Sequence, residues 1–248
     1  MAAIEAIQQV TPNDTRTIDE MRRWLLQEKR TQTWDTPINS VNAIWAFLAN
    51  NTSQTNLTSS TIPTTLAIDG APINLPKATA GLGYVKTAIS HPQGKTFTAT
   101  KTSEGTSWGA VYAQFLQKTS EVEAAQSGIT IKREIMGSSL KVGDRIKVRI
   151  TIETSRDLDF VQVVDHRAAC MEPVRQLSGY QQGAYVSPKD AATHYFYGGL
   201  SKGKHEIYTE YYIDRAGHYE TGTCSVGCAY APEYRATAPS ITLNVEEK

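Results

Sequence analysis

The sequence has no net charge and no long apolar run, and each absence excludes a class of function. Its 25 Lys and Arg residues balance 25 Asp and Glu residues. A nucleic-acid surface needs an excess of basic side chains to displace counterions from phosphates, so we predict no nucleic-acid partner. No apolar run approaches the roughly 18 residues that a membrane-spanning helix needs, so we also predict no membrane insertion by this segment.

The amino terminus lacks the features of a secretory signal peptide. Its first ten residues, MAAIEAIQQV, have neither a basic beginning nor a long apolar core. The chain is therefore expected either to be cytoplasmic or to be part of a larger secreted protein.

Cysteine is scarce, and the odd number of residues present, Cys170, Cys224 and Cys228, excludes a complete set of disulfides. If Cys224 and Cys228 share a strand they lie roughly 13 Å apart, too far to bond with each other. The sequence has no Cys-x-x-Cys pair, so a structural zinc site is not expected. Cys170 has no evident base beside it and is better interpreted as a small buried residue.

The sequence also lacks recognisable catalytic patterns. It contains no Gly-x-Ser-x-Gly, no phosphate-binding loop and no dinucleotide fingerprint, and its histidines show no metal-ligand spacing. The triplet Asp165-His166-Arg167 would place neighbouring side chains on opposite faces of a strand, so they cannot converge on one atom. We therefore expect no enzymatic activity, no cofactor and no metal.

The amino-terminal fifth of the chain is patterned for helices. Residues 2 to 10 predict a first helix. Thr17 and Glu20 form a capping box, which predicts that a second helix begins at Thr17. Thr36 and Pro37 predict the start of a third helix, so that residues 17 to 50 form an αα-hairpin. The apolar stripes of the last two helices are Ile18, Met21, Trp24 and Leu25, then Val41, Ile44, Trp45 and Leu48.

These few helices cannot bury all of their apolar surface against one another. They either pack on the following β region or are the last units of a longer helical array. The array predicts large apolar side chains exposed on the helices. Residues 50 to 60 are polar and predict a linker.

The rest of the chain alternates and turns as strands do, with a hairpin signal at Asp69-Gly70. Closely spaced strands of this kind indicate antiparallel β-sandwiches, and their number suggests a boundary between residues 117 and 127. The fold class is therefore mainly β with an amino-terminal α segment. The predicted strands are 64–68, 71–75, 83–89, 96–102, 107–116, 129–135, 145–152, 160–164, 193–197, 205–213, 219–230 and 240–245.

Tyrosine is concentrated near the carboxyl end, where ten of the twelve lie between Tyr180 and Tyr234. Core packing with hydroxyls at the rim explains most of them. A sugar-binding platform and a protein-contact face are the alternatives. Residues 208 to 234 predict the closing hairpin of a sandwich, with a tyrosine-bearing segment, residues 228 to 234, at its end.

Six segments, in order, resemble the carboxyl-terminal end of bacterial α2-macroglobulin-like proteins. They are residues 21–34, 108–112, 142–144, 167–173, 211–217 and 230–234. The resemblance implies that residues 1–50 are the final helices of an α/α-toroid, or thioester-type, domain. It further implies that residues 51–120 are part of a CUB-like β module and that residues 121–248 are the terminal macroglobulin-type sandwich.

The resemblance also implies a function outside catalysis. Proteins of this family trap proteases after cleavage of a bait region, and a Cys–Gln thioester couples to the attacker. This sequence lacks the Cys-x-Glu-Gln pattern, so it cannot form the covalent bond itself. The full-length protein is expected to be extracytoplasmic, in the periplasm or at the cell surface, and to have proteases and its own upstream helical domain as partners.

The closing segment is the predicted place of that interdomain contact. Tyr230, Pro232, Glu233 and Tyr234 would meet the helical domain, and Tyr230 would shield the thioester from water, with Pro232 stiffening the segment. The alternative, from another class, is a β-sandwich module that binds cell-surface glycans or is purely structural.

Overall fold

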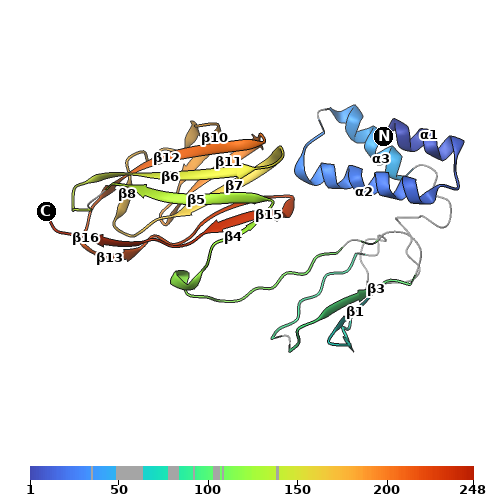
Figure 1. The fold of residues 1–248 in the computed structure, drawn as a ribbon, viewed down its shortest axis with the longest axis horizontal. Helices are drawn as coiled ribbons and strands as arrows, with labels where there is room; N and C mark the ends of the chain where they lie inside the picture. Colours follow the sequence, from blue (N-terminus) through green and yellow to red (C-terminus); the bar gives the residue numbers. More distant parts are fainter. Residues whose placement is uncertain are drawn as a thin grey trace. The chain divides into compact units, whose positions relative to one another are not determined.

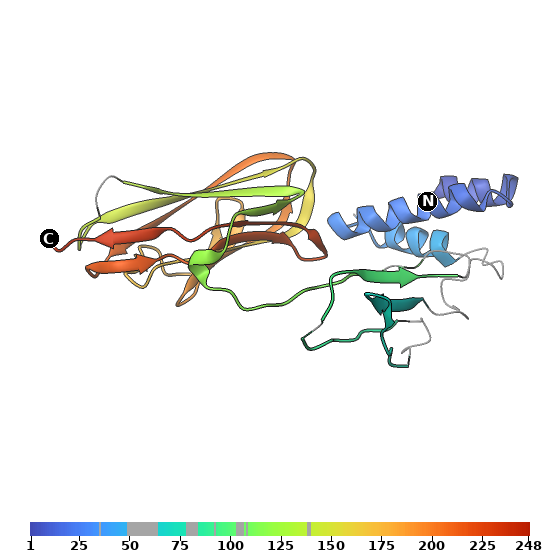
Figure 2. The same cartoon turned by 60° about the horizontal axis from the view of Figure 1, so that its bottom comes forward.

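The structure, a computed structural model, describes residues 1–34, 36–48, 64–77, 84–91, 93–102, 107, 109–137 and 140–248. They form two compact units, each with its own hydrophobic core (Figures 1 and 2). The first unit comprises Met1–Leu26 and Trp34–Ala113, and the second comprises Gln27–Thr33 and Gln114–Lys248. The predicted linker at residues 50 to 60 lies outside the described residues.

Three helices open the chain: α1 (Ala2–Val10), α2 (Thr15–Thr31) and α3 (Pro37–Leu48). Both α1 and the αα-hairpin are confirmed. The predicted start of α2 is wrong, because Asp14 rather than Thr17 caps the helix, accepting a hydrogen bond from the Thr17 amide at 3.2 Å. Glu20 instead pairs with Arg16 one turn earlier, at 3.0 Å. Within the described residues, no helix is long and apolar enough to cross a membrane.

The predicted inward face of α3 is wrong. Val41, Ile44 and Trp45 are exposed, whereas Ala43 and Ala46 are buried in the helical core. Small side chains allow close approach of α3 to its neighbours, which sequence hydrophobicity alone does not reveal. The large apolar side chains left exposed on α3 confirm what the array interpretation predicted.

A three-stranded antiparallel sheet follows in the first unit, in the order β2 (Ala71–Pro72), β1 (Thr65–Ile68), β3 (Phe97–Thr100). Asp69 and Gly70 form the turn between β1 and β2, as predicted. The strands predicted at 83–89 and 107–116 are wrong where the structure describes them, because residues 85–89 and 109–116 have no strand. Trp108 lies outside the described residues.

The second unit is a β-sandwich, which confirms the predicted fold class (Figure 1). One sheet has seven strands in the order β4-β15-β14-β7-β11-β10-β9, and the other has four in the order β5-β6-β12-β8. Strands β13 and β16 form a separate ribbon. The strand bounds are β4 (Ala125–Ser127), β5 (Ile129–Met136), β6 (Arg145–Thr154), β7 (Leu158–His166), β8 (Met171–Pro173), β9 (Gly179–Gln181), β10 (Ala184–Pro188), β11 (Ala192–Leu200), β12 (Gly203–Ile213), β13 (Gly217–Glu220), β14 (Cys224–Cys228), β15 (Ala231–Ala238) and β16 (Thr242–Val245).

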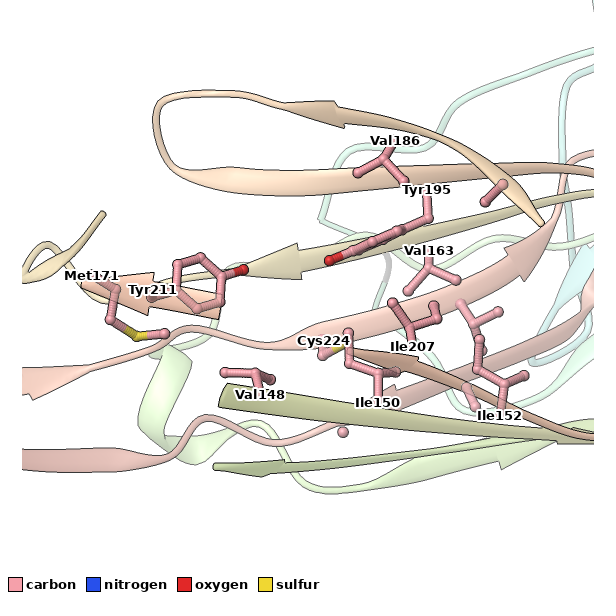
Figure 3. Close-up of a cluster of buried hydrophobic side chains, with 14 of the residues drawn as sticks. Val148, Ile150, Ile152, Val163, Met171, Val186, Tyr195, Ile207, Tyr211 and Cys224 are labelled. Atoms are coloured by element: carbon pink, nitrogen blue, oxygen red, sulfur yellow. The ribbon is translucent and has the colours of Figure 1, made fainter. Parts of the chain in front are cut away.

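Alternating side chains from both sheets build the core of the sandwich. On β6 every second residue from Ile146 to Ile152 is buried, which is the period-two pattern that the sequence predicted. Three tyrosines, Tyr195, Tyr197 and Tyr211, belong to this core. Figure 3 shows the hydroxyls of Tyr195 and Tyr211 pointing toward each other between the sheets. Their hydroxyls contact the hydroxyls of Thr209 and Thr193, at 2.5 and 3.5 Å respectively, so both phenols are satisfied.

The long predicted strand at 219–230 is wrong. It breaks at residues 221–223, and its two parts, β13 and β14, enter different sheets. Strands β4, β8, β9, β10 and β15 were not predicted at all. Each is short or interrupted by proline or glycine, so the sequence pattern is weak even though tertiary pairing completes the sheets.

The two outer faces of the sandwich differ sharply in charge. The face of the four-stranded sheet carries crossed ion pairs, including Arg149 with Glu134 at 2.7 Å and Arg145 with Glu210. On the seven-stranded sheet, one row of directly opposed residues crosses five strands from Tyr180 to Gly227 and contains no charged side chain. The next residue across the sheet, opposite Gly227, is Arg235. The directly opposed residues of that row are Tyr180, Tyr185, Phe196, Gln162 and Gly227.

Candidate functional site

The candidate site is built on the turn that joins β14 to β15. Cys228 pairs with Ala231 across this turn, so Ala229 and Tyr230 form its two-residue loop. The turn and the carboxyl terminus lie at opposite ends of the sandwich (Figures 1 and 2). Pro232 is the second residue of β15 and is exposed. Proline has no backbone N–H to donate, and this position near the strand end tolerates the absence of that donor. We call this end of the sandwich the turn end. It comprises Arg156, Asp159, Phe160, Ala229, Tyr230, Glu233 and Tyr234.

Tyr230 projects from the loop with 63% of its surface exposed. Its ring contacts Phe160 of β7 edge to face, with ring centroids 5.1 Å apart and the planes at 87°. The backbone below the rings is also joined, because the Ala229 amide donates to the Phe160 carbonyl at 2.9 Å. The two rings therefore form a fixed apolar pair at the tip of the sandwich.

Tyr234 lies below the loop and is packed on the backbone. Its ring lies against Gly128, where an added Cβ would come within 2.5 Å of the Cδ1 atom of Tyr234. Gly128 has a φ of +68°, and its place between β4 and β5 lets the chain pass from one sheet to the other. Arg156 donates to the Tyr234 hydroxyl at 2.9 Å and lies over its ring.

Arg156 links Tyr234 to the segment Gln27–Thr33 of the same unit. Its second terminal nitrogen donates to the Glu28 carboxylate at 2.8 Å. The hydrogen bond to Tyr234, followed by that to Glu28, raises the pKa of Arg156, so the guanidinium stays charged.

Two more polar contacts join this segment to the turn end. Arg30 donates to the Glu233 carboxylate at 2.6 Å. The amide and hydroxyl of Thr33 both donate to one oxygen of Asp159, at 2.5 and 2.9 Å. Three carboxylates therefore lie in charge-assisted or multiple hydrogen bonds at this place. The prediction that Tyr230, Pro232, Glu233 and Tyr234 make an interdomain contact stays a prediction.

The other residues weighed in the sequence do not gather into a reactive site. Asp165 faces the core and pairs with Arg133, while His166 points outward and Arg167 donates to the carbonyls of residues 189 and 190. Cys170, Cys224 and Cys228 are buried, free thiols. Among the residues that the structure describes, no three His, Cys, Asp or Glu side chains are grouped to hold a metal ion.

Sequence patterns did not reveal three residues of the turn end. Arg156 follows β6 in a polar turn, and Asp159 and Phe160 lie in a strand, so none carries a motif. Only the positive φ of Phe160 and the contacts themselves mark them. The site offers apolar rings and paired charges.

The sandwich matches a known protein family. Residues 115–233 match the family described as the bacterial Alpha-2-macroglobulin MG10 domain. These residues are thus similar to that domain of bacterial α2-macroglobulins. The resemblance drawn from the sequence is thereby confirmed, and Tyr230 and Glu233 of the turn end lie within the matched residues.

Solved bacterial α2-macroglobulins are similar to about half of this chain. Salmonella α2-macroglobulin reacted with methylamine has 25% identity over 50% of this chain and 10% of that chain, with a TM-score of 0.45. Native α2-macroglobulin from Escherichia coli, spanning domain MG7 to the C-terminus, has 21% identity over 51% of this chain and 25% of that one, with a TM-score of 0.44. The match thus spans a small part of these relatives. No curated protein matches the sequence.

Proposed function

We propose that the MG10 domain is the terminal, non-catalytic domain of an α2-macroglobulin-type endopeptidase inhibitor, and that its turn end packs on a thioester-type helical domain. The observation that carries the proposal is the set of contacts between the turn end and the segment Gln27–Thr33. This segment lies in the region that the resemblance assigns to the final toroid helices. Glu28, Arg30 and Thr33 each bond with the sandwich there.

In this proposal Tyr230 excludes water from the thioester until the protease trap is released. A half-exposed ring held on a stiff two-residue loop suits that role, because it can cover a neighbouring group without unfolding the sandwich. The proposal includes proteases as partners and an extracytoplasmic location, both for the full-length protein.

The test uses the full-length protein, with the free thiol released by thioester hydrolysis as the readout. Tyr230→Gly should speed hydrolysis several-fold and leave the unfolding midpoint of the sandwich unchanged. Tyr185→Gly is a matched control, because Tyr185 is a partly exposed ring on β10 in the same sheet. Equal hydrolysis rates in Tyr230→Gly and the parent protein would contradict the shielding role.

The contact itself is tested by exchanging one charge pair. Arg30→Glu and Glu233→Arg should each increase proteolytic cleavage at the loop after α2 by about twofold, because an exposed ion pair contributes about 0.5 kcal/mol. The double variant should return the cleavage rate to that of the parent chain. Additive increases in the double variant would mean that the pair does not hold the segment.

A second candidate function, glycan binding, is favoured by one observation, the uncharged aromatic row on the seven-stranded sheet. The Tyr180 and Tyr185 rings lie 5.3 Å apart, and Gln162 beside Phe196 offers an amide that could bond to sugar hydroxyls. Binding of neutral polysaccharides to the full chain should then be lost in Tyr180→Ala. Tyr212→Ala, an exposed tyrosine on the charged face, should bind as the parent does.

A further inference from the structure

Phe160 has a backbone conformation that its position in a strand does not explain. Its φ is +57°, in the left-handed region that bulky side chains rarely adopt. The described residues contain three other non-glycine residues with positive φ, and two of these, Asp69 and Gln182, precede a glycine in a tight turn. Phe160 is instead within β7. Such conformations are costly and persist where the surroundings impose them.

Burial of the ring does not account for the strain. The Phe160 side chain lies on the outer face of its sheet with 40% of its surface exposed. Phe196 on the adjacent strand β11 faces the same way with 42% exposed and has no positive φ. A phenylalanine on this face therefore does not need a left-handed backbone.

The strained residue does organise the loop that carries Tyr230. Three successive contacts join β7 to the end of β14 and the loop that follows it. The Asp159 carbonyl accepts the Cys228 thiol at 3.2 Å, the Phe160 carbonyl accepts the Ala229 amide at 2.9 Å, and the Phe160 ring contacts the Tyr230 ring. The regular pairing of β7 with β11 is interrupted at the same point, because Val161 pairs with Tyr197 and Asp159 with Gly199, whereas Phe160 is paired with no residue of β11.

We infer that Phe160 is a positioning residue that uses its left-handed backbone to fix the Tyr230 ring at the tip of the sandwich. This inference rests on the proposed function, in which Tyr230 shields a thioester. The two rings then act as one rigid apolar cap, and the strain of β7 is the structural cost of holding it in place. Phe160 touches neither the thioester nor the protease and acts only through Tyr230.

The first test uses the 248-residue chain and needs no thioester. Phe160→Gly removes the ring and also relieves the left-handed strain, since glycine adopts positive φ readily. We expect an unfolding midpoint in urea equal to or above that of the parent, together with loss of the inter-ring NOE and greater mobility of the Tyr230 ring by NMR. The matched control, Phe196→Gly, should lower the midpoint and leave Tyr230 unchanged.

Two further variants keep the test decisive. Phe160→Asn tolerates the left-handed conformation without a ring, so it should free Tyr230 even if the glycine variant folds poorly. Phe160→Tyr should restore the ring contact. A lower midpoint in Phe160→Gly with an unchanged Tyr230 ring would overturn the inference, because Phe160 would then be an ordinary packing residue.

The second test uses thioester hydrolysis in the full-length protein and separates the two proposals. Phe160→Gly should speed hydrolysis at least threefold, and adding it to Tyr230→Gly should change the rate no further. If Tyr230→Gly speeds hydrolysis and Phe160→Gly does not, the positioning role fails while shielding stands. If Tyr230→Gly has no effect, the shielding function fails, while the NMR measurements on the 248-residue chain still decide whether Phe160 positions Tyr230.

Discussion

Arg133 of β5 and Asp165 of β7 form an ion pair that joins the two sheets of the sandwich inside its core. The guanidinium and the carboxylate lie 3.0 Å apart, and only 2% of each side chain is exposed. Burial raises the pKa of Asp165, and the neighbouring Arg133 opposes this shift. The guanidinium also donates to the Thr221 hydroxyl and to the carbonyls of His166, Gly222 and Pro239. One side chain therefore ties both sheets to the loops at one edge.

We expect the loss of either partner to be strongly destabilising. Arg133→Met should lower the free energy of unfolding by about 3–5 kcal/mol, because it leaves Asp165 buried without its counter-charge. Removing both charges should cost less than the sum of the single changes. Urea denaturation measures each value. Arg145→Met removes an exposed ion pair and should lower the free energy of unfolding by about 1 kcal/mol or less. An equally small loss in Arg133→Met would contradict the role of the buried pair.

Gly128→Ala should disturb the packing of Tyr234. A positive φ alone costs about 1 kcal/mol for alanine. Gly143 is a control for this cost, because its φ is +93° and a Cβ added there would have no atom within 4 Å. Gly128→Ala should cost clearly more than Gly143→Ala, because its Cβ meets the Tyr234 ring. The excess should shrink when Tyr234→Ala is added. Equal losses in both glycine variants would exclude a clash with Tyr234.

The three thiols should resist modification in the folded chain. Cys170, Cys224 and Cys228 are buried, and burial raises the pKa of the Cys170 and Cys224 thiols, so the reactive thiolate is rare. Ellman's reagent should detect almost no thiol in native protein and all three after denaturation. Rapid reaction of one thiol without denaturant would show that its strand opens locally.

Acid should weaken the sandwich through the charged outer face. Hydrogen bonds from Lys132 and then Arg149 lower the pKa of Glu134, and Lys204 and Arg145 do the same for Glu206 and Glu210. The unfolded chain then binds more protons than the folded chain in this range. The stabilisation is therefore complete above the ordinary carboxyl pKa of 4.5 and is lost as the pH falls through the lower folded values.

Unfolding free energies measured from pH 6 to pH 3 should show this loss. Lys132→Gln removes the ion pair that Lys132 forms with Glu134 at 2.9 Å, so the slope of stability against pH should be shallower in this variant. An identical slope in both proteins would mean that Glu134 does not contribute.

The helices and most of the longer strands could be predicted because their signals are local. Thr36 and Pro37 begin α3 as predicted, and the Thr36 hydroxyl accepts the Asn39 amide at 3.3 Å. The failures have a different cause. Asp14 caps α2 where Thr17 was predicted to do so. Ala43 is buried on α3 where Val41 was predicted to be. In both places the sequence offered more than one suitable residue, and the packing of neighbouring elements decided between them.

By itself the sequence determined the fold class, the absence of catalytic patterns and the resemblance to α2-macroglobulins, since each rests on composition, period or ordered motifs. It also singled out Tyr230, Glu233 and Tyr234. The tertiary structure alone decided what these residues contact. Arg30, Arg156 and Phe160 lie far from them in sequence, and the strained backbone of Phe160 has no residue pattern. Such contacts arise only when strands pair, because side chains distant along the chain meet only in the packed fold.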